Sequence, residues 1–188
     1  MLRIIAATVL LLVLFVSLPF AVTAKTKKRG GGLRSYDYTI VGVISRSGIP
    51  KDKHLVWLKK HGRISLVNLL PNSEDDGKGD ITKLPSFKRL GFTYLHLSIA
   101  GASVTKEKQV KTFLDFATNK KNKPMHIFCR AGNARTGVMV TLYRYSVQGW
   151  TMKKALKEAR GFGGGLSHKQ RAWLREWAKT HNPGTYKK

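Results

Sequence analysis

The sequence predicts an α/β domain in which helices cover both faces of a central sheet of four or five strands. Short stretches rich in β-forming residues alternate along the chain with segments whose apolar residues recur at helical spacing. The clearest pair is residues 125–128, which read as a buried strand, and residues 134–147, which read as a mostly apolar helix. With 188 residues, 42% of them hydrophobic, the chain is long enough for one domain with a core of its own.

The first half of the domain is expected to hold two strands and two helices. Residues 38–45 alternate loosely and are rich in β-forming residues, which favours a strand. Residues 51–61 end before Gly62, a common helix terminator, and are expected to form a helix. A short helix at residues 84–90 and a strand at residues 92–99 follow.

The second half is expected to be mainly helical. Apolar residues share one face in each of two further helices: Val110, Phe113, Leu114 and Ala117 in the first, and Met152, Ala155, Leu156 and Ala159 in the second. Ser167 and Gln170 have the spacing of a capping box, which predicts the start of a last helix. Its Trp173 and Trp177 suit the core better than a platform for stacking bases.

The two ends of the chain differ in composition from the domain expected at residues 38–180. Residues 1–24 carry a single charge and end on small residues, which predicts a secretory signal peptide or a membrane anchor. We therefore expect a periplasmic or secreted protein, or one tethered to a membrane. An anchor that faces the cytoplasm is the alternative, because basic residues follow position 24. Residues 25–37 read as a basic, glycine-rich linker and residues 181–188 as a basic tail.

The chain is strongly basic. It has 35 Lys and Arg residues against 10 Asp and Glu residues, a formal charge of +25. A field of this sign attracts polyanions, and it also suits a surface that only aids solubility. We expect a phosphorylated substrate and an anionic membrane surface as partners, rather than nucleic acid, and we assume a monomer. The single cysteine and six scattered histidines lack the spacing of a metal site, so no metal is expected.

The single cysteine, Cys129, follows the strand at residues 125–128 and precedes a helix that begins near Arg135. Backbone N–H groups at a helix start favour an anion, and a cysteine in such a place is a thiolate more readily. We expect residues 130–134 to form a phosphate-sized cradle, with Arg135 as a bidentate clamp and Thr136 as a hydroxyl partner of the sulfur. The cradle residues are Arg130, Ala131, Gly132, Asn133 and Ala134. A buried structural cysteine beside a capping loop is the alternative.

The motif at residues 129–137 has a cysteine, five further residues, and then arginine, threonine and glycine. It resembles the signature of the cysteine-dependent tyrosine and dual-specificity phosphatases. The resemblance covers roughly residues 38–180 and implies their α/β fold, a cysteinyl-phosphate intermediate and no cofactor. A second likeness begins at Arg46, which stands in Arg-Ser-Gly-x-Pro. It is similar to the small plant-and-fungal branch and its bacterial relatives, whose members include inositol pyrophosphate phosphatases. This likeness suggests substrate binding by Arg46, and a role in the turn alone is equally compatible.

The sequence departs from this family in two places. The family generally has an aspartate in the loop after the strand at residues 92–99, where this chain has Ala100 or Gly101. A histidine usually precedes the cysteine, where this chain has Phe128, with His126 two residues earlier. We expect His126 to be a satisfied core residue. Candidates for the missing acid come from the acidic loop upstream: Asp75, Asp76 and Asp80.

The predicted function is hydrolysis of phosphate esters or anhydrides, of the phosphotyrosine, dual-specificity or inositol-phosphate type. A phosphoanhydride has a better leaving group than a phosphotyrosine and needs less help from an acid. Two alternatives remain open at this stage. One is a phosphate-binding pseudophosphatase without turnover, and the other is a basic, membrane-tethered protein that binds polyanions.

Overall fold

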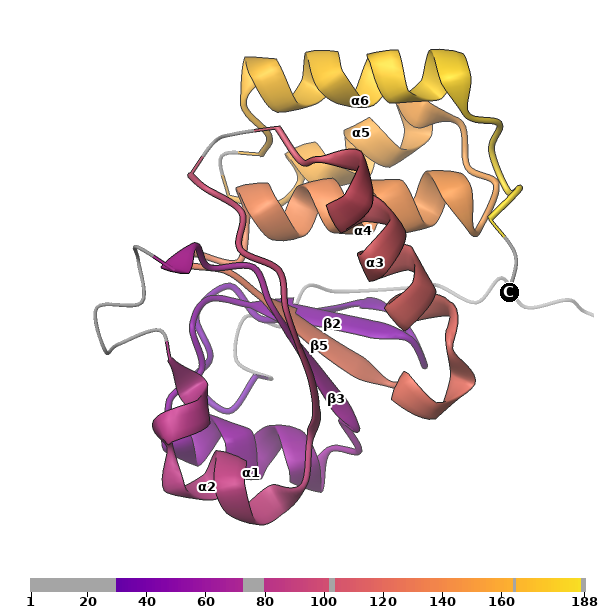
Figure 1. Cartoon of the computed structure of the whole chain (residues 1–188). Coiled ribbons are helices and arrows are strands. Elements are labelled where there is room, and N and C mark those ends of the chain that lie inside the picture. The colour runs from indigo at the N-terminus through magenta and orange to yellow at the C-terminus, as the bar shows by residue number, and fades with distance from the viewer. Residues whose placement is uncertain (1–29, 73–79, 102–103, 164, 187–188) are drawn as a thin grey trace, which may run out of the picture.

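A computed structural model describes residues 30–72, 80–101, 104–163 and 165–186. These residues form a sheet of five strands between two layers of helices, as the sequence predicts (Figure 1). The strands are β1 (Asp37–Ile40), β2 (Ile44–Ser47), β3 (Ser65–Asn68), β4 (Thr93–His96) and β5 (Met125–Phe128). The helices are α1 (Asp52–Lys60), α2 (Pro85–Leu90), α3 (Glu107–Thr118), α4 (Ala134–Ser146), α5 (Met152–Arg160) and α6 (His168–Thr180), with the 3-10 helices η2 (Ile81–Lys83) and η3 (Lys120–Asn122).

The strand order places β5 in the middle of the sheet. The order is β1-β2-β5-β3-β4, and every pair is parallel except β1 with β2. Parallel strands end at the same edge, so the segments that leave β2, β5, β3 and β4 meet there. In open sheets of this kind, ligands bind at the carboxyl ends of the strands.

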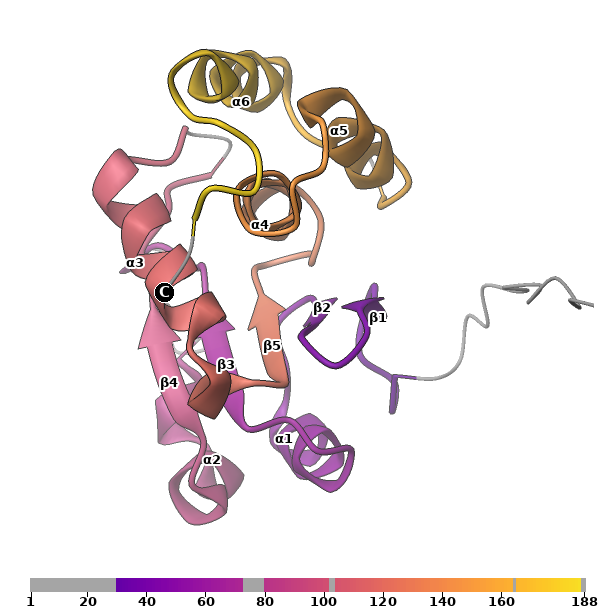
Figure 2. The same cartoon turned by 90° about the vertical axis from the view of Figure 1, so that its right-hand side faces the viewer.

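Each face of the sheet has its own apolar core. Leu66 of β3 and Phe128 of β5 pack with α1 on one side, where α2 also lies. Val67 and Ile127, their neighbours along the same strands, pack with α3 and α4 on the other side. Figure 2 shows α5 and α6 stacked outside α4. The alternation of neighbouring strand residues between the two cores is the pattern of a sheet that is covered on both faces.

The expected strand at residues 38–45 is wrong in its extent, because the chain turns back within it. β1 ends at Ile40 and β2 starts at Ile44, and Val43 N–H donates to Ile40 O across the turn. Gly42 lies in this turn with φ +73°, a conformation that glycine adopts at little cost. The hairpin adds the antiparallel edge strand, which makes five strands in all.

Two segments that we expected to be free pack on the domain. Of the linker expected at residues 25–37, the described part contributes Leu33, 7% exposed, to the core beside α1. In the expected tail, Gly184 N–H donates to Tyr145 O, and the Tyr186 hydroxyl donates to Asp115 Oδ1 at 2.6 Å. The tail therefore joins α4 to α3 at the end of α4 far from Cys129.

The segment expected to be a signal peptide or anchor, residues 1–24, lies outside the described part of the chain. Among the residues that are described, no helix combines the length and the apolar character that crossing a bilayer requires.

Candidate active site

The predicted loop lies at the carboxyl edge of the sheet. Cys129 directly follows β5, and Arg135 is the second residue of α4. Since β5 is flanked by β2 and β3, the loop at residues 129–133 lies between the ends of both neighbouring strands. The sulfur, the expected cradle and the arginine thus come from one loop and one helical turn.

Cys129 and Thr136 meet at the base of this loop. Cys129 is 3% exposed, and its Sγ lies 3.9 Å from Thr136 Oγ1. Thr136 Oγ1 also lies 3.2 Å from Asn133 O, to which it can donate. A single hydroxyl proton serves either the sulfur or this carbonyl, so the hydroxyl can turn to the sulfur when negative charge develops there.

Arg46 lies behind the loop and holds it through three acceptors. Its Nε and Nη2 donate to Gly132 O at 2.9 and 2.7 Å, and Nη2 also donates to Asn133 O at 2.7 Å and Thr136 Oγ1 at 2.9 Å. The side chain is 1% exposed. The direct contact with substrate that the sequence suggested for Arg46 does not fit this geometry. Arg46 instead supports the loop from the protein interior.

These carbonyl contacts fix the direction of the loop amides. In a trans peptide the N–H points away from the C=O of the same unit. With the carbonyls of Gly132 and Asn133 turned toward Arg46, the N–H groups of Asn133 and Ala134 face the opposite side. Within the described part of the chain, no N–H from residues 130–133 donates a hydrogen bond. The loop therefore offers unused donors at a helix start, as an anion site requires.

The charge of Arg46 is buried next to the sulfur. Burial lowers the pKa of Arg46 to about 10, and the nearby Cys129, Asp37 and Glu158 oppose that shift. A pKa near 10 still leaves the guanidinium charged at neutral pH. The guanidinium also lies 4.2 Å from the centre of the Phe162 ring. Arg46 thus places a buried positive charge on Thr136, the hydroxyl that contacts Cys129 Sγ.

Arg135 fixes the other side of the loop. Its side chain is 7% exposed, and its Nη1 donates to Leu69 O at 3.4 Å and Ile99 O at 3.3 Å. These carbonyls follow β3 and β4, so the arginine joins the ends of two parallel strands to the first turn of α4. Contacts at Nη1 set the plane of the guanidinium fork, which is how a bidentate clamp is held in place.

The loop packs against the end of β2 so closely that only glycine fits. Gly132 has φ +78°, and a Cβ there would lie 2.5 Å from the Ser47 carbonyl carbon and 2.7 Å from the Gly48 nitrogen. From the other side, a Cβ on Gly48 would lie 3.1 Å from Arg130 O. The peptide between Ser47 and Gly48 is thus the surface on which the loop rests.

The segment between α5 and α6 also reaches the site, and the sequence did not suggest this. Phe162 covers Arg46, and a Cβ on Gly163 would lie 2.5 Å from Asn133 Nδ2. Nothing local marks this segment as part of the site, because its partners lie about 30 residues upstream and on β2.

His126 is buried, as expected, and is part of a polar cluster that sequence reasoning missed. Its Nδ1 lies 2.9 Å from Ser45 Oγ and its Nε2 lies 2.8 Å from Ser47 Oγ. Burial first, and then the charges of Arg63 and His54, lower the pKa of His126 to about 3. The imidazole is therefore neutral at neutral pH. Two serines around Arg46 in an otherwise β-prone stretch were the available signal.

The three candidate acids fall in different places. Asp75 and Asp76 lie outside the described residues. Asp80 caps η2, where its Oδ1 accepts from Thr82 N–H at 3.0 Å and its Oδ2 pairs with Lys83 Nζ at 3.3 Å. Hydrogen bonds from Thr82 lower the pKa of Asp80. A general acid needs the opposite shift, so Asp80 is poorly suited to the role.

The loop after β4, where the family's aspartate is expected, borders the site as predicted. Ile99 O accepts from Arg135, and the next residues are Ala100 and Gly101, which have no proton to donate from a side chain. Other carboxylates among the described residues pair with neighbouring side chains: Asp37 with Thr39, Asp52 with Ser86, Asp115 with Lys111 and Tyr186, Glu158 with Arg144, and Glu176 with Lys179.

We expect Asp80→Asn to change kcat/KM on an aryl phosphate by less than about twofold. Asparagine caps helices about as well as aspartate, and the native carboxylate holds no proton to give. The measurement is a pH–rate profile beside Asp75→Asn and Asp76→Asn, which carry the same substitution in the same acidic loop. A tenfold loss in kcat with loss of the basic limb in Asp80→Asn would show that Asp80 is the acid after all.

No group of three or more His, Cys, Asp or Glu side chains suited to a metal ion occurs among the described residues. The donors around the sulfur are N–H groups and guanidinium groups, which bind anions rather than cations. A thiol between an amide-lined loop and two arginines is the site of a cysteine-based phosphatase.

Comparison with known proteins agrees with this site. The sequence model of the family described as PTP-NADK, a DSP-PTPase phosphatase fused to NAD+ kinase, matches residues 26–176. The chain therefore belongs to this family of dual-specificity and tyrosine phosphatases. The family is the one expected from the cysteine and arginine motif.

Individual relatives are distant. The chain is 27% identical over 124 residues to the putative tyrosine-protein phosphatase OCA1 of Mycosarcoma maydis, covering 66% of this chain and 77% of that protein. It is 25% identical over 128 residues to the dual specificity phosphatase TpbA of Pseudomonas aeruginosa, covering 67% of this chain and only 55% of TpbA.

Solved structures share the fold. A putative phosphatase from Shewanella putrefaciens superposes with a TM-score of 0.64 at 23% identity, covering 80% of this chain and 95% of that one. The phosphatase PTPMT1 superposes with a TM-score of 0.65 at 18% identity, covering 77% of this chain and 94% of that one.

Proposed function

We propose that this chain hydrolyses phosphate monoesters or phosphoanhydrides through a phosphate-binding loop at residues 129–135, with Cys129 as nucleophile. The observation that carries the proposal is the orientation of the loop peptides. Arg46 draws two carbonyl oxygens to one side, so the N–H groups of the same peptides face the other side, at the start of α4 and in the loop that begins with Cys129. Donors fixed before the substrate arrives stabilise charge without reorganisation.

The reaction needs two displacements at phosphorus. The Cys129 thiolate forms the S–P bond as the P–O bond to the leaving group breaks, and that oxygen leaves with the bonding electrons. Water then attacks the cysteinyl phosphate, and the P–S bond breaks to release phosphate and the thiolate. Thr136 donates to the departing sulfur, and Arg135 with the loop amides holds the three equatorial oxygens.

The substrates that fit best have good leaving groups. Where a family aspartate is expected, this chain has Ala100 and Gly101, so the leaving oxygen gains no proton from these two side chains. A phosphate leaving group, with a second pKa near 6, needs far less protonation than a phenol with a pKa of about 10. Structural neighbours have been seen with phosphotyrosine, in TpbA, and with PI(5)P, in PTPMT1. We therefore place phosphoanhydrides first, aryl phosphates such as phosphotyrosine second and alkyl phosphates last.

The test is to trap the intermediate on the native chain. We expect acid quenching during turnover of 4-nitrophenyl phosphate to leave one phosphate on the peptide that contains Cys129, the chain's single cysteine. Released phosphate, measured beside an inositol pyrophosphate and a phosphotyrosine peptide, should follow the leaving-group order above. Release of phosphate without a labelled cysteine would exclude the covalent route.

One observation favours a second candidate, a pseudophosphatase that binds phosphate without turnover. Ala100 and Gly101 stand where the family's aspartate is expected, and a cradle without an acid can still bind phosphate. The same assay separates the two. Protection of Cys129 from alkylation by inorganic phosphate, with no phosphate release from any of the three substrates, would identify the binding module.

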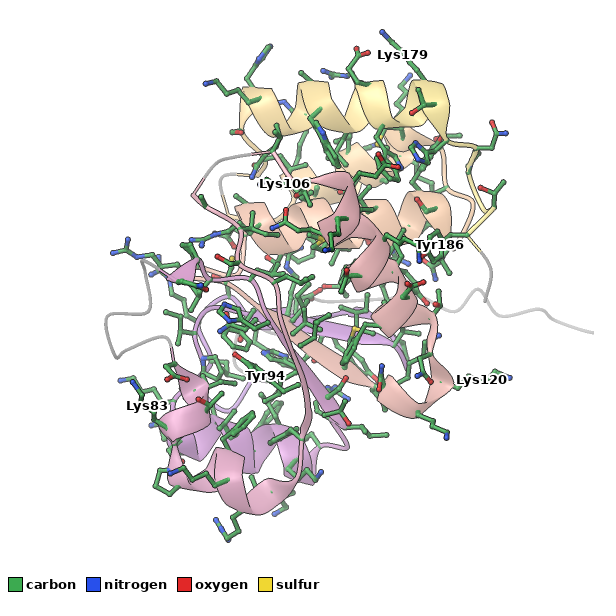
Figure 3. The ribbon with its side chains drawn as sticks, in the orientation of Figure 1. Lys83, Tyr94, Lys106, Lys120, Lys179 and Tyr186 are labelled. Atoms are coloured by element: carbon green, nitrogen blue, oxygen red, sulfur yellow. The ribbon has the colours of Figure 1, made fainter. Side chains whose placement is uncertain are left out.

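Positive charge is spread over the surface, and it supports the proposal of an anionic partner. Figure 3 shows Lys83, Lys106, Lys120 and Lys179 extending from four separate elements, and the side chains of Lys83 and Lys179 are 74% and 68% exposed. Charge spread in this way attracts polyanionic substrates from any direction. We also propose contact with an anionic membrane surface and export or tethering through residues 1–24, supported by the apolar composition of that segment.

A further inference from the structure

We propose that His126 is a positioning residue, which sets the phosphate-binding loop through Ser47 and Gly48. The proposal rests on the proposed function of that loop. His126 does not touch the loop itself. It lies on β5, three residues before Cys129, with Ser45 and Ser47 of the neighbouring strand β2 on its two ring nitrogens.

The contacts form a chain from one side of the sheet to the loop. Arg63 Nε donates to Ser45 Oγ at 2.9 Å, and Ser45 Oγ lies 2.9 Å from His126 Nδ1. At the other nitrogen, His126 Nε2 lies 2.8 Å from Ser47 Oγ. Ser47 Oγ in turn donates to Gly48 O at 2.7 Å. His126 and both serines are fully buried, so water does not compete for these groups.

Counting protons fixes the direction of every bond. A carbonyl cannot donate, so the single Ser47 hydroxyl proton goes to Gly48 O, and Ser47 must accept from His126. In a neutral ring the proton is then on Nε2, and Nδ1 accepts from the Ser45 hydroxyl. Ser45 Oγ is left to accept from Arg63, which is the bond observed. Ser45 Oγ also lies 3.4 Å from Met125 O, a longer contact than the 2.9 Å to Nδ1, so the direction of the Ser47 bond is what selects the tautomer.

The last members of the chain are the surface on which the loop rests. Hydrogen bonds hold both backbone groups of Gly48. Its N–H donates to Arg34 O at 2.8 Å, and its carbonyl accepts from the Ser47 hydroxyl. Gly132 lies against the Ser47–Gly48 peptide with no room for a methyl group. A shift of Ser47 therefore moves Gly132, whose carbonyl orients the N–H of Asn133.

The loop is thus held from both faces of β2. Arg46 points to one face and holds the loop carbonyls, while Ser45 and Ser47 point to the other face and hold His126. In proteins with a histidine directly before the cysteine, that residue is next to the loop. Here Phe128 occupies that position and packs in the apolar core beside α1. His126 lies two residues earlier on β5 and acts on the loop through Ser47 of β2.

The test uses Ser47→Ala and His126→Phe, with Ser65→Ala as a matched control. Ser65 is also fully buried on a strand and donates to a backbone carbonyl, that of Asn122, at 2.6 Å, but its strand is not in this chain of contacts. We expect the two test variants to weaken inorganic phosphate binding, measured as protection of Cys129 from alkylation, by about 10–100-fold. Ser65→Ala should bind phosphate like the native chain.

Two further readouts keep a folding defect apart from a positioning effect. Nitrogen-15 NMR of the native chain should show His126 protonated on Nε2 and not on Nδ1 at pH 7. In the two test variants, the Ki of phosphate should rise by a larger factor than kcat falls. Their thermal stability should match that of Ser65→Ala. An Nδ1–H tautomer, an imidazolium, or native phosphate affinity in folded Ser47→Ala would each overturn the proposal.

These outcomes distinguish a failure of the role proposed for His126 from a failure of the proposed phosphatase function. If the native chain neither binds phosphate nor turns over, the phosphatase assignment fails, while the NMR measurement still reports on the chain of contacts. If the native chain binds phosphate and Ser47→Ala binds it equally well, only the role of His126 fails.

Discussion

Cys129→Ser is expected to lower kcat on 4-nitrophenyl phosphate by at least about 10⁴-fold, with the fold unchanged. A serine hydroxyl is not ionised at neutral pH, and the hydrogen-bond partner of Cys129 Sγ among the described residues is the Thr136 hydroxyl, which is not a base. The amide donors and both arginines remain in place, so phosphate affinity should stay within about threefold. Initial rates and equilibrium dialysis with inorganic phosphate measure the two effects separately.

Cys129→Ala is the control for this result, because it also removes the serine hydroxyl, which is at best a weak nucleophile. Both variants should be equally inactive. More than about a tenth of native turnover in either variant would mean that another residue attacks phosphorus, and the proposed mechanism would then be wrong. Because the chain has one cysteine, a thiol reagent on the native protein provides an independent check of the same site.

The catalytic loop could be predicted because its parts are close in sequence. Cys129, Arg135 and Thr136 lie within eight residues, and the strand before them and the helix after them are marked by apolar residues. A phosphate site at a helix start is built mainly from consecutive backbone groups, so its geometry is largely local. The role of Arg46 could not be predicted in this way, since its partners lie 86 to 90 residues away.

The distinction between local signals and contacts distant in sequence also explains which parts of the fold could be predicted. The helices were predicted within a few residues, because helical periodicity and caps such as Ser167 with Gln170 are local signals. The hairpin of β1 and β2 was missed because valines flank Gly42, and a β-forming composition runs through the turn. Leu33 was read as part of a linker because a single leucine among glycines and basic residues carries no periodicity. Only the tertiary structure shows the apolar cluster beside α1 that it joins.

Arg46→Met is expected to lower kcat/KM by about 10²–10³-fold and to lower the free energy of unfolding by about 2–4 kcal/mol. Methionine fills much of the same volume, but it leaves Gly132 O and Asn133 O buried without donors and removes the cation that reaches Cys129 through Thr136. The rate of iodoacetamide alkylation against pH measures how readily the thiolate forms. We expect the profile to move to higher pH.

Arg144→Met is the control for loss of an arginine that holds several partners, with its side chain 11% exposed. Arg144 holds Glu158 at 2.6 Å and donates to Thr39 O at 2.9 Å, and its guanidinium stacks on Trp150, so its loss should also destabilise the fold. None of these partners belongs to the loop at residues 129–135, so the alkylation profile of Arg144→Met should match the native one. If both variants shift the profile equally, the effect of Arg46 is general destabilisation. If only Arg46→Met shifts it, the effect belongs to the arginine behind the loop, because both variants lose a hydrogen-bonded cation and only Arg46 contacts the loop carbonyls.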